Sequence, residues 1–261
     1  MYNPDTISVV CATYNRPKSL LHLLEQLGDQ RCVNLAEDID VVVVDDGSPQ
    51  SMMPSFPAYP FKFQYIYRER HPQNLARVYS SRNMAVANSV GKYVLQLDDD
   101  LEFSPYLLNI LQSCAGLATG DYVWCPRISN NSDVDTNGGF TRGKDGRWYD
   151  GQCKWQETHW QSSTSAGMFM PRSTWDKLGG YDEQFDEAMG AADQELALRV
   201  QKLGGKPGVV SVTLAPYFVN IADEESGSWR MSMIDRALKT GRKRNETLFA
   251  AKHPDAKDWA V

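Results

Sequence analysis

The chain has 261 residues, of which 42% are apolar and 23% charged, and its net charge is −6. This composition is that of a folded globular protein and excludes disordered and fibrous classes. The acidic balance argues against a nucleic-acid partner, because phosphate binding normally needs a basic face. No apolar run approaches the roughly 20 residues that span a bilayer, and the N-terminal segment lacks the features of a signal peptide. We therefore expect a cytoplasmic protein.

The first half of the sequence alternates strand-like and helix-like segments. Buried strands rich in β-branched residues alternate with segments whose apolar residues follow helical spacing. The predicted strands are residues 7–13, 39–48, 61–69, 92–97 and 121–128, and the predicted helices are residues 19–27 and 75–89. This order is typical of a mostly parallel central sheet flanked by helices. The predicted fold class is therefore α/β.

Two of these strands end in carboxylates. The segment "VVVVDDGS" ends in Asp45 and Asp46, and "YVLQLDDD" ends in Asp98, Asp99 and Asp100. Three adjacent carboxylates repel one another unless a cation or a set of strong donors neutralises them. The alternative is a solvated surface turn before a helix that starts near residues 104–105. Because ligands of open α/β sheets bind at the carboxyl ends of the strands, the two clusters together favour a metal and phosphate site.

Arg82 lies on the predicted helix at residues 75–89. It shares a face with the apolar residues Leu75, Val78, Ala85 and Val86. A guanidinium on a core-facing stripe requires an anionic partner. That partner is either Asp45 or Asp46, in an internal salt bridge, or a bound phosphate or nucleotide, and one arginine can serve both.

Residues 129–164 are polar and too long to be a simple connection. They carry the aromatic residues Trp148, Tyr149, Trp155, His159 and Trp160. These rings either form a small satellite core or bind the faces of acceptor sugar rings. We therefore expect an insertion that lies beside the site and binds a second, sugar-containing substrate.

The next segment, "SAGMFMPRSTWDKLGGYDEQFDEAMGAADQELALRVQKLGG", predicts a short strand, a turn at Gly179 and Gly180, and a helix from about Asp193. A carboxylate is favoured at a helix start by free N–H groups and the helix dipole. Asp193 is therefore either a helix cap or a functional residue.

Six segments of the chain resemble, in the same order, the signature segments of family 2 glycosyltransferases. They are "SVVCATYNRP", "VVVVDDGS", "ARVYSSRN", "YVLQLDDDLEF", "KLGGYDEQF" and "GAADQELALRV", within residues 7 to about 204. The resemblance implies an inverting enzyme with one GT-A domain over residues 1–261. It divides this domain into a nucleotide-sugar-binding half at 1–128, an acceptor-binding and catalytic-base half at 129–220, and a C-terminal helical extension at 221–261.

The resemblance also implies which residues hold the donor, a nucleotide-sugar and most simply a UDP-sugar. Contacts with the nucleotide are implied for Thr13, Tyr14, Asp45, Asp46, Arg82, Asp98 and Asp99. Asp98 would be turned to the ribose, and Asp100 would bind a divalent cation, Mn²⁺ or Mg²⁺, on the diphosphate.

On the acceptor side the resemblance implies that Asp193 is the catalytic base, with Glu195 as a supporting carboxylate. The acceptor would be a hydroxyl group of a glycan or a glycolipid, which Asp193 deprotonates for in-line attack at the anomeric carbon.

Two positions depart from the family's pattern. Ala192 replaces the acidic residue that usually precedes the base, and Asn220 stands where many relatives have a histidine as a metal ligand. Asn can still offer a carbonyl oxygen to a metal. The change at Ala192 motivates an alternative, in which the chain is a catalytically inactive protein that binds a nucleotide-sugar.

The C-terminal segment predicts an amphipathic helix. Apolar residues follow helical spacing at Trp229, Met233, Ile234, Ala237 and Leu238, within a stretch rich in Arg and Lys. This helix either closes over the core with a solvated basic face or makes peripheral contact with an anionic membrane that presents a lipid-linked acceptor.

Overall fold

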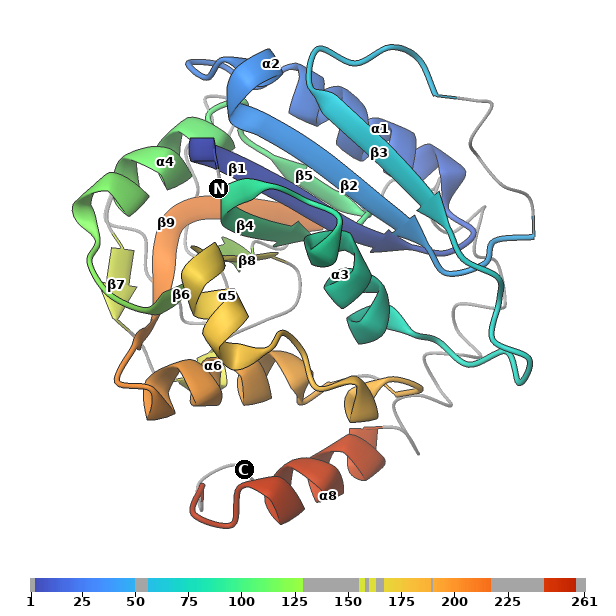
Figure 1. Cartoon of the computed structure of the whole chain (residues 1–261), viewed down its shortest axis with the longest axis vertical. Coiled ribbons are helices and arrows are strands. Elements are labelled where there is room, and N and C mark those ends of the chain that lie inside the picture. The colour runs from blue at the N-terminus through green and yellow to red at the C-terminus, as the bar shows by residue number, and fades with distance from the viewer. Residues whose placement is uncertain are drawn as a thin grey trace.

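A nine-stranded sheet organises the computed structural model, in which residues 3–49, 56–128, 155–157, 160–162, 167–188, 190–216 and 242–256 are described (Figure 1). The N-terminal half contains β1 (Asn3–Thr13), α1 (Pro17–Gly28), α2 (Leu35–Asp38), β2 (Ile39–Asp45), β3 (Lys62–Tyr67), α3 (Val78–Ala87) and β4 (Gly91–Leu97). These elements confirm the alternation that the β-branched and leucine-rich segments predicted.

The remaining elements extend the same sheet. They are β5 (Leu101–Phe103), α4 (Leu107–Leu117), β6 (Tyr122–Ile128), β7 (Trp155–Glu157), β8 (Gly167–Pro171), α5 (Arg172–Leu178), α6 (Ala192–Lys202), β9 (Lys206–Pro216) and α8 (Arg242–Lys252). The strand order is β3-β2-β1-β4-β8-β6-β9-β5, with β7 paired to β9. Strands β3, β2, β1 and β4 are parallel, whereas β8 pairs antiparallel with β4 and with β6.

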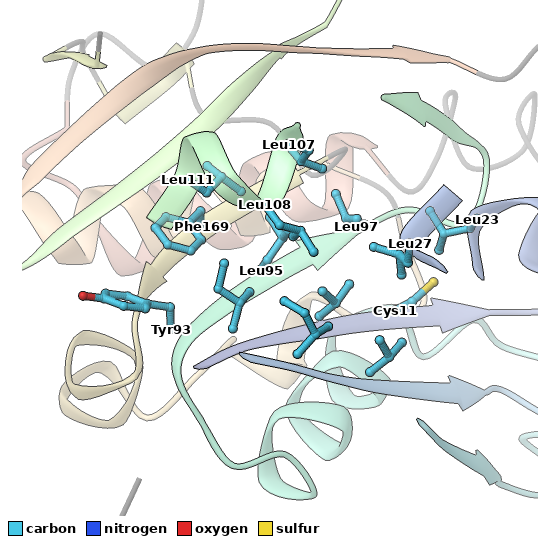
Figure 2. Close-up of a cluster of buried hydrophobic side chains, with 14 of the residues drawn as sticks. Cys11, Leu23, Leu27, Tyr93, Leu95, Leu97, Leu107, Leu108, Leu111 and Phe169 are labelled. Atoms are coloured by element: carbon cyan, nitrogen blue, oxygen red, sulfur yellow. The ribbon is translucent and has the colours of Figure 1, made fainter. Parts of the chain in front are cut away.

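The sheet has a separate apolar core on each face. Residues alternate between the two faces along each strand, so Val9 and Leu95 belong to one core and Val10 and Val94 to the other. Helices α1 and α4 cover the first core, part of which is drawn in Figure 2. Helices α3, α5 and α6 cover the second, and α8 packs outside α6 with Phe249 buried (Figure 1). This three-layer arrangement is the predicted α/β class.

Helix α3 begins later than its sequence predicted. Val78 is its first residue and is 38% exposed, and Leu75 lies before the helix, so neither contributes the expected buried stripe. The preceding residues are held in a loop, because the Arg77 backbone N–H donates to Asp46 Oδ2 at 2.9 Å. Arg82 is nevertheless buried, at 2% exposure, on the face that also carries Ala85 and Val86.

The strand register brings the predicted functional residues to one edge of the sheet. Thr13 at the end of β1 lies opposite Asp45 at the end of β2, and Val10 lies opposite Gln96 on β4. The aspartates that follow β4 therefore emerge beside the end of β1. This is the edge at which open α/β sheets bind ligands.

Candidate active site

The ends of β1, β2 and β4 are tied together by hydrogen bonds. The Asp46 backbone N–H donates to the Thr13 carbonyl at 2.9 Å, and the Thr13 hydroxyl donates to Asp99 Oδ2 at 2.6 Å. The predicted nucleotide-side residues of the two carboxylate clusters thus form one continuous site. Their roles toward a nucleotide stay predictions.

The three aspartates after β4 point to different partners. Asp98 pairs with Arg82. Asp99 and Asp100 share one nitrogen of Arg16, Nη1, which lies 2.7 Å from Asp99 Oδ1 and 3.0 Å from Asp100 Oδ2. Two arginines of the chain itself therefore neutralise part of the repulsion within the run, which the sequence had attributed to an external cation. The alternative of a freely solvated turn is wrong, since Asp99 is buried.

Arg82 connects this cluster to the predicted base. Its guanidinium pairs with Asp98 and lies 3.6 Å from Asp193 Oδ1. These partners replace Asp45 and Asp46, the partners that the sequence offered. Burial lowers the pKa of Arg82, but the charges of Asp98 and Asp193 outweigh it and the pKa is raised. Arg82 is thus a permanent cation between two carboxylates.

Asp98 retains some proton affinity despite Arg82. Partial burial and the like charges of Asp100, Asp99 and Asp193 raise its pKa, Arg82 lowers it, and the net effect is a raised pKa. In the described part of the chain, four carboxylates at this strand end share the two guanidinium groups of Arg16 and Arg82. Among the described residues, the cluster therefore carries more negative than positive charge.

The carboxylates after β2 have a different environment. Asp45 accepts hydrogen bonds from the Ser48 backbone N–H, the Ser48 hydroxyl and the Tyr65 hydroxyl. Asp46 accepts from Arg70 at 2.8 Å and from the Arg77 side chain at 2.8 Å. Both carboxylates are buried and held by neighbours on β3 and on the loop before α3.

Gly47 lets the loop before α3 pack onto the end of β2. Its φ is +83°, a conformation that side chains disfavour, and a Cβ there would overlap the backbone of Arg70. Arg70 then places its guanidinium 3.9 Å from the centre of the Tyr14 ring, in a cation–π contact. Tyr14 and Asp46 thus share Arg70 as a common neighbour.

Asp193 is the second residue of α6 and not its cap. The capping position is Ala191, whose φ is +69°. The Asp193 carboxylate is buried, and the Tyr181 hydroxyl lies 2.8 Å from its Oδ1. The sequence predicted that backbone N–H groups at the helix start orient the Asp193 carboxylate. Among the described contacts of Asp193, a side-chain hydroxyl takes this role instead.

The Tyr181 hydroxyl also lies 2.8 Å from Gln96 Oε1, although it carries only one hydrogen. The Gln96 amide nitrogen is buried and has no partner among the described residues. If the Gln96 side-chain amide is rotated by 180°, its nitrogen donates to the Tyr181 hydroxyl oxygen. The single hydrogen of the Tyr181 hydroxyl is then donated to Asp193. Burial, followed by the charge of Asp193, raises the pKa of Tyr181, so the hydroxyl keeps this hydrogen.

Residues near Asp193 clarify two further predictions. Ala192 is fully buried and belongs to the apolar core that α6 covers. Glu195 pairs with Arg199 at 2.8 Å and with His253 at 3.1 Å, on the side of α8. Glu195 therefore has a counter-ion of its own in Arg199.

The aspartates do not form a ready-made metal cage. Within the described ranges, no group of three or more His, Cys, Asp or Glu side chains is arranged to hold a metal ion. Asp100 offers a carboxylate at the edge of the site, which fits a hard cation whose other ligands are diphosphate oxygens and water. Asn220, the other predicted metal ligand, lies outside the described residues.

Several aromatic residues predicted to bind sugar are placed differently or lie outside the described part. Trp160 is buried and stacks on Phe249, 5.3 Å between ring centres, so it belongs to the core and not to an acceptor surface. Trp148, Tyr149 and His159 lie outside the described residues, as does the predicted amphipathic helix around residues 229–238. Across the described segments, no helix has the length and apolar character needed to cross a membrane.

The sequence reasoning missed several site residues, among them the neighbours of Asp99 and Asp193. Arg16 and Tyr181 both lie inside segments that carried the resemblance, "SVVCATYNRP" and "KLGGYDEQF". Arg16 follows the end of β1, so the strand-end rule that selected the aspartates also applies to it. Tyr181 precedes Asp193 by 12 residues, and no local spacing connects the two side chains.

Comparison with known proteins identifies the family. The sequence profile described as Glycosyl transferase family 2 matches residues 8–173, more than half of the chain. The chain therefore belongs to family 2 of the glycosyltransferases. No curated protein matches its sequence significantly.

Solved structures share the fold at low sequence identity. TarS of S. aureus is 16% identical with a TM-score of 0.58, over 94% of this chain and 42% of TarS. TarS 1-349 in complex with UDP-GlcNAc is 15% identical with a TM-score of 0.56, over 96% of this chain and 73% of the other. GalNAc-T7 with UDP, GalNAc and Mn²⁺ is 15% identical with a TM-score of 0.62, over 98% and 58%. The chain thus spans less than two thirds of TarS and GalNAc-T7.

Proposed function

We propose that the chain transfers a sugar from a UDP-sugar to a hydroxyl group of a glycan or lipid-linked acceptor, with inversion at the anomeric carbon. The observation that carries this proposal is the position of Asp193 beside Arg82 and Asp98, at the carboxyl ends of the central strands. Family membership supports the reaction class. The UDP-GlcNAc bound by TarS and the UDP bound by GalNAc-T7 support the donor nucleotide.

In this proposal Asp193 takes the proton of the acceptor hydroxyl. The acceptor oxygen forms a bond to the anomeric carbon while the bond from that carbon to the diphosphate oxygen breaks on the opposite side. Tyr181 orients Asp193 through its hydroxyl, and Arg82 fixes the position of Asp193 relative to Asp98. A positioned base of this kind contributes a factor on the order of 10² to 10⁴ in rate.

The chain's own contribution to metal binding is Asp100, with Asn220 as the second proposed ligand. A bound Mn²⁺ or Mg²⁺ ion would stabilise the negative charge that develops on the departing diphosphate. The presence of Mn²⁺ in the GalNAc-T7 structure supports a metal requirement here. Donor hydrolysis and transfer are therefore expected to stop in excess chelator and in Asp100→Ala, and to resume for the parent protein when Mn²⁺ is restored. Full activity in chelator contradicts the metal requirement.

Asp193→Asn tests the proposed base. The substitution keeps the size of the side chain and its contact with Tyr181, so the melting temperature and UDP affinity should stay close to those of the parent. Transfer should fall by a factor on the order of 10² to 10⁴. Asp29→Asn, an exposed position at the far end of α1, is the matched control and should retain full activity. Normal turnover by Asp193→Asn would assign the base to another carboxylate, and a retained product configuration would contradict inversion.

The alternative function, an inactive nucleotide-sugar-binding protein, predicts donor binding without turnover. The presence of Asp98, Asp100 and Asp193 together weighs against it, because Arg82 lies against both Asp98 and the proposed base. Hydrolysis of UDP-sugars with Mn²⁺ distinguishes the two functions, since an inactive protein releases no UDP above the uncatalysed rate.

A further inference from the structure

Arg16 occupies the position of a counter-ion within the aspartate cluster. It is the last residue before α1, and Pro17 begins the helix. One of its terminal nitrogens, Nη1, lies between Asp99 Oδ1 at 2.7 Å and Asp100 Oδ2 at 3.0 Å. A single cationic nitrogen therefore bridges two carboxylates, which is the arrangement expected of a bound cation.

The two bridged carboxylates are not equivalent. Asp99 is buried, and its second oxygen accepts the Thr13 hydroxyl at 2.6 Å, so both of its oxygens are committed within the protein. Asp100 keeps 19% of its side-chain surface exposed, and Arg16 keeps 24%. The contact between Arg16 and Asp100 is therefore the part of the cluster that a ligand can reach and exchange.

A divalent cation and Arg16 compete for Asp100. Two like charges at contact distance repel strongly in a partly buried site, and the repulsion grows with the charge of the ion. A planar guanidinium also binds phosphate well, because two of its parallel N–H groups can donate to two phosphate oxygens. A donor diphosphate thus offers Arg16 a new partner at the moment when Asp100 is needed by a metal.

We propose that Arg16 is the resident counter-ion of Asp100 and exchanges Asp100 for the donor diphosphate when metal and nucleotide bind. The inference rests on the proposed function, in which Asp100 is the metal ligand. The exchange couples the binding of the metal ion to the binding of the nucleoside diphosphate. Metal binds weakly to the free protein, because Arg16 occupies Asp100, and binds more tightly once a nucleoside diphosphate has taken over Arg16.

Arg16→Gln separates this exchange from ordinary structural damage, because it shifts two affinities in opposite directions. Without nucleotide, the Mn²⁺ affinity of the variant should rise about tenfold, since a competing cation is gone. With saturating Mn²⁺, its UDP affinity should fall about tenfold, the loss expected for one charge-assisted phosphate contact. General damage to the site would weaken both. Free Mn²⁺ can be counted by electron paramagnetic resonance, and UDP binding by calorimetry on the full chain.

Arg31→Gln is the matched control. Arg31 is exposed beyond the end of α1, and its replacement removes the same unit of charge from the protein. Both affinities should stay within about twofold of the parent, which excludes a general effect of net charge. If Arg16→Gln melts too early for assay, Arg16→Lys keeps the charge without the planar fork and should shift both affinities in the same directions by a smaller factor.

The outcomes are distinguishable. Mn²⁺ binding by the parent with unchanged or weaker binding in both Arg16 variants overturns the exchange and leaves the metal requirement intact. Absence of Mn²⁺ binding by the parent and the variants, with and without UDP, overturns the metal requirement of the proposed function and the exchange with it.

Discussion

The ends of β2 and β4 balance their charges in opposite ways. At the end of β2, one carboxylate, that of Asp46, is surrounded by three guanidinium groups, from Arg68 at 3.9 Å and from Arg70 and Arg77 at 2.8 Å. At the end of β4, four carboxylates share two guanidinium groups within the described residues. Only β1 separates these two strands, so the two ends lie roughly 10 Å apart.

This difference indicates different uses of the same side-chain chemistry. A carboxylate with an excess of positive partners gains little from another cation, and its position is fixed from several sides. Asp46 is therefore suited to be a rigid hydrogen-bond acceptor, as the resemblance implies for a nucleotide base or ribose. At the end of β4 the described carboxylates outnumber the described guanidinium groups, and a cluster with net negative charge attracts a cation. The end of β4 is thus the part of the site that is suited to a metal.

Removing Arg82 should break this balance most severely. Arg82→Met leaves Asp98 and Asp193 facing each other without their shared cation, and removal of one partner from a buried ion pair typically costs about 3 to 5 kcal/mol. We expect the free energy of unfolding to fall by about 3 kcal/mol, the low end of this range. The side chain of Asp98 is 32% exposed, so water can solvate its charge when Arg82 is removed. Urea denaturation measures this loss.

The double variant Arg82→Met with Asp98→Asn serves as the control for that experiment. It removes the Arg82 guanidinium together with the negative charge of Asp98, one of its two carboxylate partners. Part of the lost free energy of unfolding should therefore be recovered. Equal stability of the single and double variants would mean that Asp98 does not depend on Arg82, and the imbalance at the end of β4 would have been overestimated.

The sequence predicted the parallel half of the fold well, because each of its elements is long and strongly patterned. The β-branched run from Val41 to Val44 is buried on both faces of the sheet, and the leucines of α1 pack on one of these faces. The C-terminal half was harder to predict. Strand β8 has five residues and enters the sheet between β4 and β6, so its pairing depends on contacts distant in sequence that no local pattern encodes.

The site could be predicted as a location but not as a set of pairs. The strand-end rule brought Asp46 and Asp98 to one edge of the sheet, and the helical stripe indicated that Arg82 faces an anion. It could not say which arginine faces which carboxylate, because Arg16 and Asp99 are 83 residues apart and adjacent aspartates point in different directions. Side-chain direction after a strand depends on the local backbone, which composition and spacing do not determine.

Asp46→Asn sharpens the comparison at the end of β2. The substitution leaves three arginines around a neutral amide, and the lost charge-assisted hydrogen bonds should cost about 2 kcal/mol of stability. If Asp46 is a fixed acceptor for the nucleotide, UDP affinity should fall several-fold, although the site has become more positive. Calorimetric titration with UDP measures this. A gain in UDP affinity would instead mean that the arginines attract the phosphates and that Asp46 merely neutralises them.

Tyr181→Phe should have the smallest effect of these substitutions. It removes a neutral hydroxyl that contacts Asp193, the fourth carboxylate of the cluster at the end of β4. The ring keeps its packing against Tyr79 and Trp175, with ring centres 5.1 Å and 5.6 Å away, so the loss of stability should be limited to about 1 kcal/mol. Because Asp193 loses the donor that orients it, turnover should fall about fivefold to tenfold, while UDP affinity stays unchanged.

Tyr122→Phe is the matched control for this variant. Its hydroxyl is also buried, but it lies in the core on the opposite face of the sheet and has no hydrogen-bond partner among the residues described. Removing it should leave turnover and UDP affinity as they are, and removing an unpaired hydroxyl should not reduce stability. If Tyr181→Phe lowers stability and UDP affinity together with turnover, the Tyr181 hydroxyl supports the fold around α6. A selective fall in turnover would show that it positions Asp193, and the end of β4 would then depend on a neutral donor as well as on its two arginines.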